Sequence, residues 1–312
     1  TALCFGAAVE EIVLCTKEIA ENAYTETKTR ISNSPQVALN FNFRIAPNAP
    51  NSHVTGVKNS LAPGVSFWAS EVPSDRLSTM FVASGNDVDW LVTELAALGL
   101  DPNFSDEDIR DLKSGRLGLG VAMRAEANDG SRVLIFINFS VFSSFTKAGM
   151  SNRDPSIYLS AHEWTHLVQF HLGQNNTPCW WTEGSATFFG TIPALREGVT
   201  SYDKYAPVRI GAVRSKLESE ADSKSRQIKD WIEWLEKPDC TKTSYGAGYL
   251  VTEYLVGQYG LKATIEVMNL MGPEMQWQSA VEDVYGTPYA ELLSEIATHL
   301  KYVFSGTEYL SN

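Results

Sequence analysis

The N-terminal half of the chain alternates between two hydrophobic patterns, one with the period of a helix and one typical of a β-strand. Apolar residues recur at helical spacing over 7–31, 52–70 and 87–97, which predicts three helices. Between these helices, residues 36–45 alternate apolar with polar, and residues 76–83 are richer in apolar side chains. The first pattern predicts a half-buried strand and the second a more buried one. This part of the chain is therefore expected to be mixed α/β.

Three shorter signals complete this region. Ser105-Asp-Glu-Asp108 has a capping-box pattern, which predicts the start of a short helix. The apolar runs 117–124 and 132–139 flank the turn-forming Asn128-Asp-Gly-Ser131 and predict a β-hairpin, so a small mixed sheet is expected. The second of the expected helices contains Pro63-Gly64, which should bend or split it.

Residues 154–172 carry the helical pattern near the middle of the chain. The pattern starts with Asp154 as an N-cap candidate and Pro155 at the first helical position, and it stops at Gly173. Beyond that glycine the sequence shows no strand pattern, only helical segments. These segments lie near 179–196, 201–222, 226–236, 244–259, 261–271 and 287–304.

The change of pattern at Gly173 indicates a lobe boundary. We expect an α+β protein with an N-terminal α/β lobe over 1–173, which contains the small mixed sheet, and a C-terminal helical lobe over 174–312. A cleft between two lobes is a common place for a substrate groove.

The pentapeptide His162-Glu-Trp-Thr-His166 lies on the helix predicted over 154–172. Residues four apart on a helix face the same side, so His162 and His166 present their imidazoles at a separation that one tetrahedral metal ion bridges. Glu163 is rotated by about 100° from His162, so it can reach over the metal as a general base. The chain holds only five histidines, and two of them framing a glutamate at this spacing argues against chance. A decayed or coincidental motif is the alternative.

A catalytic zinc keeps three protein ligands and leaves one position for water. Glu183 is the candidate for the third ligand, because the 17 residues from His166 (183 − 166) suffice for a loop and the return of a second helix. It is flanked by tryptophan and phenylalanine residues, among which an unpaired carboxylate would be costly, and Gly184 permits a close approach of that helix. His171 lies on a different helix face and is expected to be structural. Thr187, one turn after Glu183, is a candidate to orient the ligands.

The charge and hydropathy of the chain exclude two classes of partner. The formal net charge is −12, and Lys and Arg are scattered singly. Nucleic acids and anionic membranes are therefore not expected as partners, because binding either requires a concentrated basic surface. No run of 18 apolar residues occurs, so no membrane-spanning helix is predicted. The chain starts at Thr1-Ala-Leu-Cys4 without an initiator Met or a signal sequence and is expected to be a processed form.

The four cysteines, Cys4, Cys15, Cys179 and Cys240, include no C-x-x-C pair. An even number fits two disulfides in an oxidising compartment, and the pairing we favour is Cys4–Cys15 with Cys179–Cys240. Four reduced, buried thiols in a cytosolic protein are the alternative. With two disulfides, the protein is expected to be secreted or on the cell surface.

The motif His162-Glu-Trp-Thr-His166 followed by Trp181-Thr-Glu183-Gly-Ser-Ala186 resembles the gluzincin zinc metallopeptidases, in which the third ligand is a glutamate downstream of the two histidines. The match is closest to the aminopeptidase-like and peptidase MA-like branch, which shares a Trp-x-x-Glu-Gly-x-Ala segment. In that branch a tyrosine roughly sixty residues after the ligand glutamate, in a Ser-Tyr-x-x-Gly context, stabilises the oxyanion. This chain has Thr243-Ser-Tyr245-Gly-Ala-Gly248 at the corresponding place.

The resemblance covers about residues 155–260 specifically, and it implies a two-lobed gluzincin fold with one Zn²⁺ in the cleft between the lobes. It implies His162, His166 and Glu183 as the metal ligands, Glu163 as the general base and Tyr245 as the residue that stabilises the oxyanion. From the residues alone, Tyr245 competes for this role with three other tyrosines, Tyr249, Tyr254 and Tyr259.

The expected reaction is zinc-assisted hydrolysis of a peptide bond, with a peptide or protein as substrate and a monomeric enzyme. Aminopeptidases of this group carry an upstream Gly-x-Met-Glu-Asn segment, and none precedes His162, so an endopeptidase is expected. An aminopeptidase of the same group is one alternative. The other is a non-catalytic surface binding protein on a gluzincin scaffold, with a structural or vestigial metal. The intact Glu163 counts against the latter, because drift is expected to remove the base first.

Overall fold

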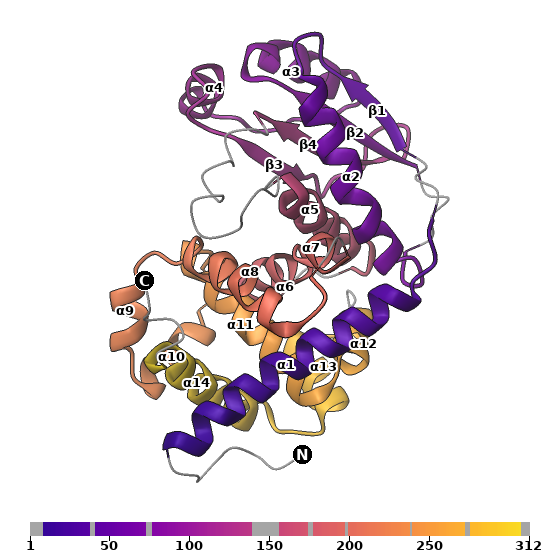
Figure 1. Ribbon diagram of the computed structural model, residues 1–312. Helices are drawn as coiled ribbons and strands as arrows, with labels where there is room; N and C mark the ends of the chain where they lie inside the picture. The colour runs from indigo at the N-terminus through magenta and orange to yellow at the C-terminus, as the bar shows by residue number, and fades with distance from the viewer. Residues whose placement is uncertain are drawn as a thin grey trace. The chain divides into compact units, whose positions relative to one another are not determined.

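The computed structural model describes residues 9–37, 41–72, 77–138, 156–173, 177–196, 199–237, 239–271 and 275–306. Over these residues the protein is mixed α+β, with one four-stranded sheet and a majority of helical residues (Figure 1). The strands are β1 (Phe41–Ile45), β2 (Ser78–Ala83), β3 (Leu119–Ala122) and β4 (Arg132–Ile137). The first helices are α1 (Val9–Asn33), α2 (Asn51–Phe67), α3 (Val88–Ala97), α4 (Asp106–Lys113), α5 (Ser156–His171), α6 (Cys179–Phe189) and α7 (Ile192–Arg196). They are followed by α8 (Tyr202–Arg214), α9 (Glu220–Ser225), α10 (Ile228–Leu235), α11 (Lys242–Tyr259), α12 (Leu261–Leu270), α13 (Trp277–Tyr285) and α14 (Tyr289–Ser305).

The sheet has the strand order β1-β2-β4-β3. The pairs β1–β2 and β2–β4 are parallel, whereas β3 and β4 form the antiparallel hairpin that the turn at Asn128-Asp-Gly-Ser131 predicts. The two central strands are buried almost throughout, and the two edge strands are only half-buried. The sequence-based expectation of a small mixed sheet is therefore confirmed, including the more buried character of the second strand.

The sequence predicted that Pro63-Gly64 would bend or split helix α2. This helix continues through both residues from Asn51 to Phe67, so it is not split. Proline removes one backbone donor, but here it lies only one turn before the end of the helix. Packing stabilises the helix before and after the proline, because α2 lies against α5. The contact is close at Gly64, where a β-carbon would lie 3.4 Å from the Cβ of Ala161 on α5. Packing of one long face therefore outweighs the single lost hydrogen bond.

The chain forms two compact units. The sheet unit comprises Asn33–His171 and Phe189–Glu197, and the helical unit comprises Thr1–Ser32, Leu172–Phe188 and Gly198–Asn312. The change of unit at His171–Leu172 lies next to the lobe boundary expected at Gly173, but the sequence-based lobes were continuous and these units are not. Each unit is described separately below.

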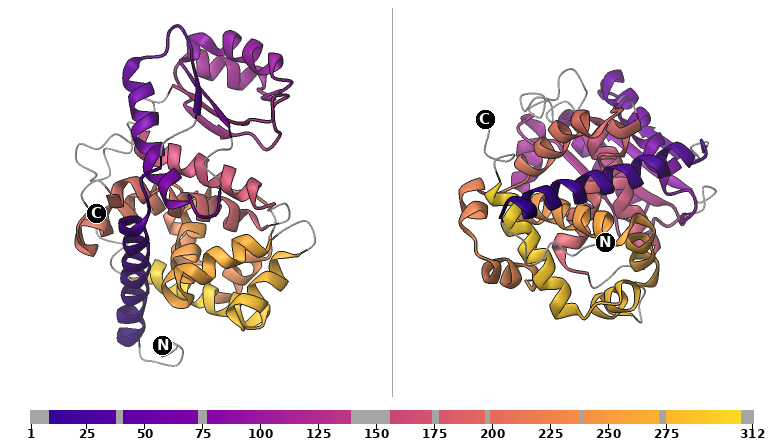
Figure 2. Two further views of the ribbon diagram at one scale, coloured as in Figure 1. Left: turned by 90° about the vertical axis from the view of Figure 1, so that its right-hand side faces the viewer. Right: turned by 60° about the horizontal axis from the view of Figure 1, so that its bottom comes forward.

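Helix α1 belongs to the helical unit because several long-range contacts attach it there. The backbone N–H of Leu261 donates to Glu26, and the Lys28 ammonium donates to the carbonyl of Val199 over 3.0 Å. Gly257 of α11 lies against the backbone of Ile19. The two further views show α1 alongside the C-terminal helices (Figure 2).

Helix α11 is the centre of the helical unit, with every residue from Gly246 to Val256 buried. Both carboxylate oxygens of the buried Glu253 accept from the single Nε–H of Arg209 on α8, at N···O distances of 2.6 and 2.7 Å. A buried charge is tolerated only when it is paired in this way.

The helical segments expected after residue 173 are present, with three differences. The segment 179–196 is divided into α6 and α7, because Pro193 in the first turn of α7 has no N–H to continue the preceding helix. The segment 201–222 is divided too, and Ser219 caps the second part by accepting from the N–H of Asp222 over 3.2 Å. Helix α13 was not predicted, although it buries Trp277, Ala280 and Val281 at helical spacing. None of the described helices is both long and apolar enough to cross a membrane.

Candidate metal centre

Helix α5 carries both histidines of the pentapeptide and is held firmly in the sheet unit. Trp164 packs edge-on against Phe41 of β1, with 5.6 Å between ring centroids. Every residue of this helix from Ser160 to Gln169 is buried, because the helix packs against both α2 and the sheet. The histidines are therefore presented by a helix with little freedom to move.

The imidazoles of His162 and His166 lie one helical turn apart and face each other. Their ring centroids are 4.7 Å apart, and 3.1 Å separates the two Nε2 atoms. Both side chains are nearly buried, with 5% and 7% of their surface exposed. The spacing of four residues thus has the geometric consequence expected from the sequence.

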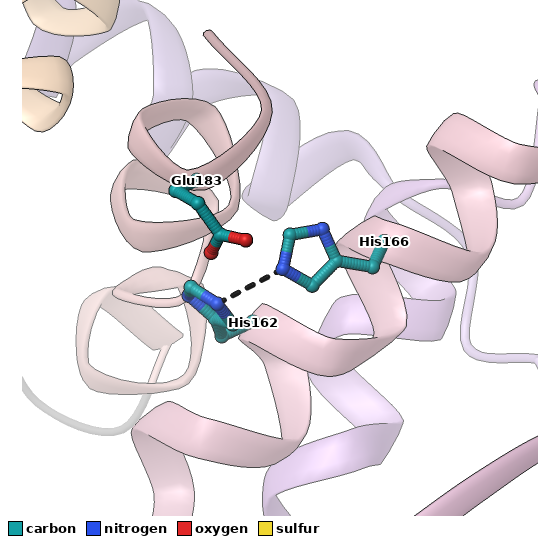
Figure 3. Close-up of side chains that lie close together, drawn as sticks. All are labelled: His162, His166 and Glu183. Atoms are coloured by element: carbon teal, nitrogen blue, oxygen red, sulfur yellow. Dashed lines mark hydrogen bonds between the residues drawn. The ribbon is translucent and has the colours of Figure 1, made fainter. Parts of the chain in front are cut away.

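Glu183, on α6, completes a group of three potential metal ligands with these histidines. One ligand atom from each residue lies within 4.8 Å of the other two. Figure 3 shows the Glu183 carboxylate pointing toward the two imidazoles. Among the described residues, this is the one cluster of His, Cys, Asp and Glu with such geometry, and neither His171 nor Glu163 is part of it.

The donor set fits zinc. Two imidazole nitrogens and a carboxylate oxygen are ligands that zinc accepts, and two atoms bound to one zinc at about 2.1 Å must lie within about 4.2 Å of each other. The 3.1 Å between the imidazole nitrogens meets this condition, and the Glu183 oxygen lies within 4.8 Å of both of them. Three protein ligands also leave the fourth position that a catalytic metal requires.

Gln169 orients one of the imidazoles, and the sequence pattern did not predict this role. Its Oε1 lies 2.7 Å from Nδ1 of His166, and its side chain is 1% exposed. Since the amide oxygen accepts, Nδ1 carries the proton, which leaves the Nε2 lone pair directed at the metal position. The position three residues after a ligand histidine on the same helix is a signal that could have identified it. Thr187, the residue expected in such a role, is fully buried on α6.

Glu163 lies on the side of α5 that contacts the edge strand β3. A β-carbon on Gly120 of that strand would lie 3.0 Å from Cγ of Glu163 and 2.8 Å from Cδ2 of Leu159. The glutamate side chain is 6% exposed. It is thus a buried carboxylate that follows the potential ligand His162 in sequence and lies outside the group of potential ligands.

Tyr245 lies in the first turn of α11, in the helical unit, and is half-buried. The ammonium of Lys216 lies 5.2 Å from the centroid of its ring, a cation–π arrangement. The three competing tyrosines are committed to other contacts. Tyr249 pairs with the hydroxyl of Tyr205, and Tyr254 and Tyr259 both donate to Glu295. The role of Tyr245 at the oxyanion stays a prediction.

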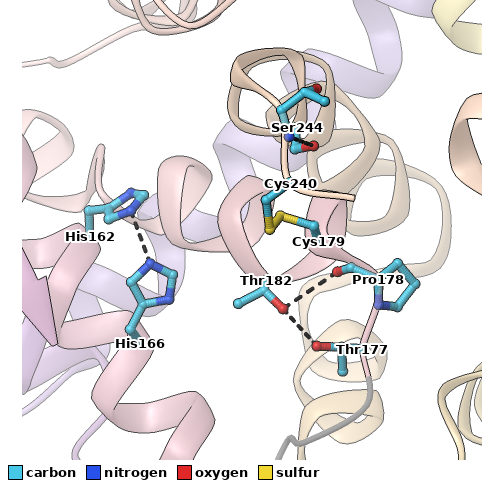
Figure 4. The surroundings of a disulfide bond; sticks show 9 residues. His162, His166, Thr177, Pro178, Cys179, Thr182, Cys240 and Ser244 are labelled. Atoms are coloured by element: carbon cyan, nitrogen blue, oxygen red, sulfur yellow. Dashed lines mark hydrogen bonds between the residues drawn. A yellow bond between two sulfur atoms is a disulfide. The ribbon is translucent and has the colours of Figure 1, made fainter. Parts of the chain in front are cut away.

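A disulfide joins Cys179 to Cys240, which confirms this half of the expected pairing. It links the first residue of α6 to the segment before α11 (Figure 4). The expected Cys4–Cys15 bond lies outside the side chains that the structure describes.

Comparison with protein-family models, with curated proteins and with solved structures returned no match. The likeness to gluzincins therefore depends on the sequence motifs and on the geometry of the ligand group.

Proposed function

We propose that the protein is a zinc-dependent endopeptidase of the gluzincin type. The observation that carries this proposal is the group formed by His162, His166 and Glu183, whose ligand atoms lie within 4.8 Å of one another. The proposal includes the gluzincin arrangement of an N-terminal α/β lobe and a C-terminal helical lobe with the zinc site in the cleft between them. That arrangement follows from the resemblance of the motifs.

Zinc bound to these ligands would polarise the substrate carbonyl and make water acidic enough to ionise near neutral pH. The protein residues supply the remaining steps. His162 and His166 bind as neutral imidazoles, and Gln169 holds the second of them in the required tautomer. Glu163 accepts the proton of the attacking water and passes it to the departing amine nitrogen. Tyr245 donates a hydrogen bond to the carbonyl oxygen as negative charge develops on it.

The edge strand β3 supports a polypeptide as substrate. It is the last strand of the sheet among the described residues, so one of its edges has no neighbouring strand. An extended peptide can pair with such an edge through main-chain hydrogen bonds. Gly120 of β3 lies directly against Glu163, so a peptide bound there would pass the proposed base. Pairing along a strand does not require a terminus of the substrate, which favours an endopeptidase.

The Cys179–Cys240 disulfide supports the proposal that the enzyme acts in an oxidising compartment, as a secreted or cell-surface protein. We further propose that it works as a monomer, because all the proposed catalytic residues belong to one chain.

Cleavage of an unfolded protein tests the proposed function. Purified protein supplied with zinc is expected to cleave casein, to lose that activity with a chelator and to regain it with added zinc. Glu163→Gln should retain the metal while lowering turnover by about 100-fold or more. An amino-acyl chromogenic substrate should not be hydrolysed. Hydrolysis of that substrate without casein cleavage would indicate an aminopeptidase, and zinc binding without any hydrolysis would indicate a binding protein.

A further inference from the structure

Two helices of the helical unit, α6 and α11, carry the proposed ligand Glu183 and the proposed oxyanion residue Tyr245. These two helices are connected at two separate points. One is a crossing of glycine backbones and the other is a disulfide. We refer to the Gly184–Gly248 crossing and the Cys179–Cys240 disulfide together as the brace.

At the crossing, the backbones of α6 and α11 are in direct contact. A β-carbon on Gly184 would lie 2.5 Å from the carbonyl oxygen of Gly248. A β-carbon on Gly248 would lie 2.8 Å from Cα of Gly184 and would overlap the carbonyl oxygen of Trp180. The obstructing atoms all belong to the backbone, so no side-chain rotation can make room. Only glycine at both positions allows this distance between the helices.

The disulfide joins the beginnings of the same two helices. Its Cα atoms are 5.2 Å apart, and Cys240 lies two residues before the start of α11. Cys179 is 4% exposed, whereas Cys240 is exposed. The chain around Cys179 is further ordered by a hydrogen bond of 2.6 Å between the hydroxyls of Thr177 and Thr182 (Figure 4).

We propose that the brace positions Glu183 and Tyr245 relative to each other, with Gly248 as its principal positioning residue. This inference rests on the proposed function, because it concerns the residues assigned there to metal binding and to the oxyanion. Glu183 directly precedes Gly184, and Tyr245 lies one turn before Gly248. A change in the distance between the helices at the crossing therefore moves both side chains.

A methyl group at Gly248 changes that distance in a defined way. With the disulfide intact, the beginnings of the two helices remain together while the crossing opens, so α6 tilts against α11. The carboxylate of Glu183 then moves from the position in which it meets the imidazoles, and the phenol of Tyr245 moves relative to it. Displacements of about 1 Å are sufficient to reduce catalysis by about 100-fold.

Gly257 provides a matched control on the same helix. A β-carbon there would lie 2.9 Å from the carbonyl carbon of Ile19, so Gly257→Ala also forces two backbones apart. This second contact joins α11 to α1, three helical turns beyond Tyr245, and involves neither α6 nor the disulfide. Both alanine variants should thus lose stability, but only Gly248→Ala should change the geometry of the proposed site.

The test compares the full-length wild type, Gly248→Ala and Gly257→Ala by three measurements. These are the zinc dissociation constant from competition with a chromogenic chelator, the kcat and KM for a peptide substrate, and the Tm of the metal-free protein. Gly248→Ala is expected to raise the zinc dissociation constant about tenfold and to lower kcat more than it changes KM. Gly257→Ala should lower Tm and leave the zinc dissociation constant within about twofold of the wild type.

A second variant keeps the test decisive if Gly248→Ala does not fold. Cys179→Ala/Cys240→Ser removes the disulfide but leaves both glycines, and it should also raise the zinc dissociation constant and lower kcat. Equal effects of the two glycine variants on zinc binding and kcat would overturn the brace, as would wild-type values in the variant without the disulfide. A wild-type protein that binds no zinc would instead overturn the proposed function itself.

Discussion

At the scale of single residues, the hydrogen bond from His166 to Gln169 is expected to control how well the proposed ligand His166 binds zinc. The Gln169 amide oxygen lies 2.7 Å from Nδ1 of His166 and selects the tautomer with Nε2 as the ligand atom. Gln169→Leu should raise the zinc dissociation constant by about 10- to 100-fold, because the imidazole loses its orientation. Gln169→Glu keeps an acceptor at the same place and should remain within a few-fold of the wild type. Competition titration with a chelator measures the zinc dissociation constant of both variants. A wild-type zinc affinity in Gln169→Leu would contradict the role of Gln169 in orienting His166.

His299 gives a residue-scale prediction about pH. Burial, with a smaller contribution from the charge of Arg209, lowers the pKa of His299 to about 3. The Nε2 atom has no hydrogen-bond partner among the described residues, so the neutral ring is the stable form in the folded protein. Between pH 6.5 and about 3 the unfolded chain binds a proton at this position that the folded chain does not. The free energy of unfolding therefore falls as the pH drops through this window.

The contribution of His299 is about 2 kcal/mol between pH 7 and pH 5, given an unfolded pKa of about 6.5. Between pH 7 and pH 5 the free energy of unfolding should therefore fall less in His299→Phe than in the wild type. The expected difference between the two decreases is about 2 kcal/mol. Urea denaturation of both proteins at the two pH values measures the difference. The same pH dependence in both would show that His299 accepts a proton in the folded state.

Most of the candidate site could be predicted at the residue scale, because the chemistry of a zinc ligand group requires particular side chains at particular spacings. His162, His166 and Glu183 were assigned from the sequence, and the structure brings their ligand atoms together. Gln169 was missed because a glutamine within a helix has many ordinary roles. Its role depends on which way its side chain turns, and the sequence does not determine this.

At the scale of elements, α11 depends on a buried ion pair. The carboxylate of Glu253 is fully buried, and 2.6 Å separates it from the nearest guanidinium nitrogen of Arg209. Glu253→Gln should lower the free energy of unfolding by about 3–5 kcal/mol, because it removes the buried carboxylate that pairs with the Arg209 guanidinium. Adding Arg209→Met should recover part of the loss.

Denaturation by urea checks this prediction, with an exposed ion pair as the control. Glu107 pairs with Arg110 on α4, where both side chains are more than half exposed. Glu107→Gln should therefore change stability by less than about 1 kcal/mol. A similar decrease in the free energy of unfolding in Glu253→Gln and Glu107→Gln would contradict the distinction between buried and exposed ion pairs.

The elements themselves were largely predictable, because periodicity records which face of a helix or strand is buried. The four strands and most helices occur where the pattern predicted them. The two errors concern prolines and have different causes. The continuity of α2 through Pro63 depends on tertiary packing against α5. The break before α7 depends on Pro193, which lies within the longer helix that the pattern predicts.

At the scale of the whole molecule, the disulfide closes a loop of 61 residues. Restricting the unfolded chain in this way should stabilise the protein by about 2–4 kcal/mol. The double substitution Cys179→Ala/Cys240→Ser, measured on the metal-free protein, should therefore lower Tm by several degrees. An unchanged Tm would mean that the bond contributes only to local geometry.

The discontinuous units are the part of the fold that the sequence did not reveal. Helix α1 belongs to the helical unit through contacts such as the close approach of Ile19 to Gly257, which joins residues more than two hundred positions apart. A glycine in a helix can be required for several different reasons, and the residue that it contacts can lie far from it in the sequence. Long-range contacts of this kind require coordinates.

The central claim is that three side chains of this protein hold one zinc ion, and elemental analysis of purified protein tests it most directly. After dialysis with excess zinc and removal of unbound metal, the wild type should retain one equivalent of zinc. His162→Ala and His166→Ala should retain little, and Glu163→Gln should retain as much as the wild type. A wild type without zinc, or histidine variants that keep a full equivalent, would contradict the account.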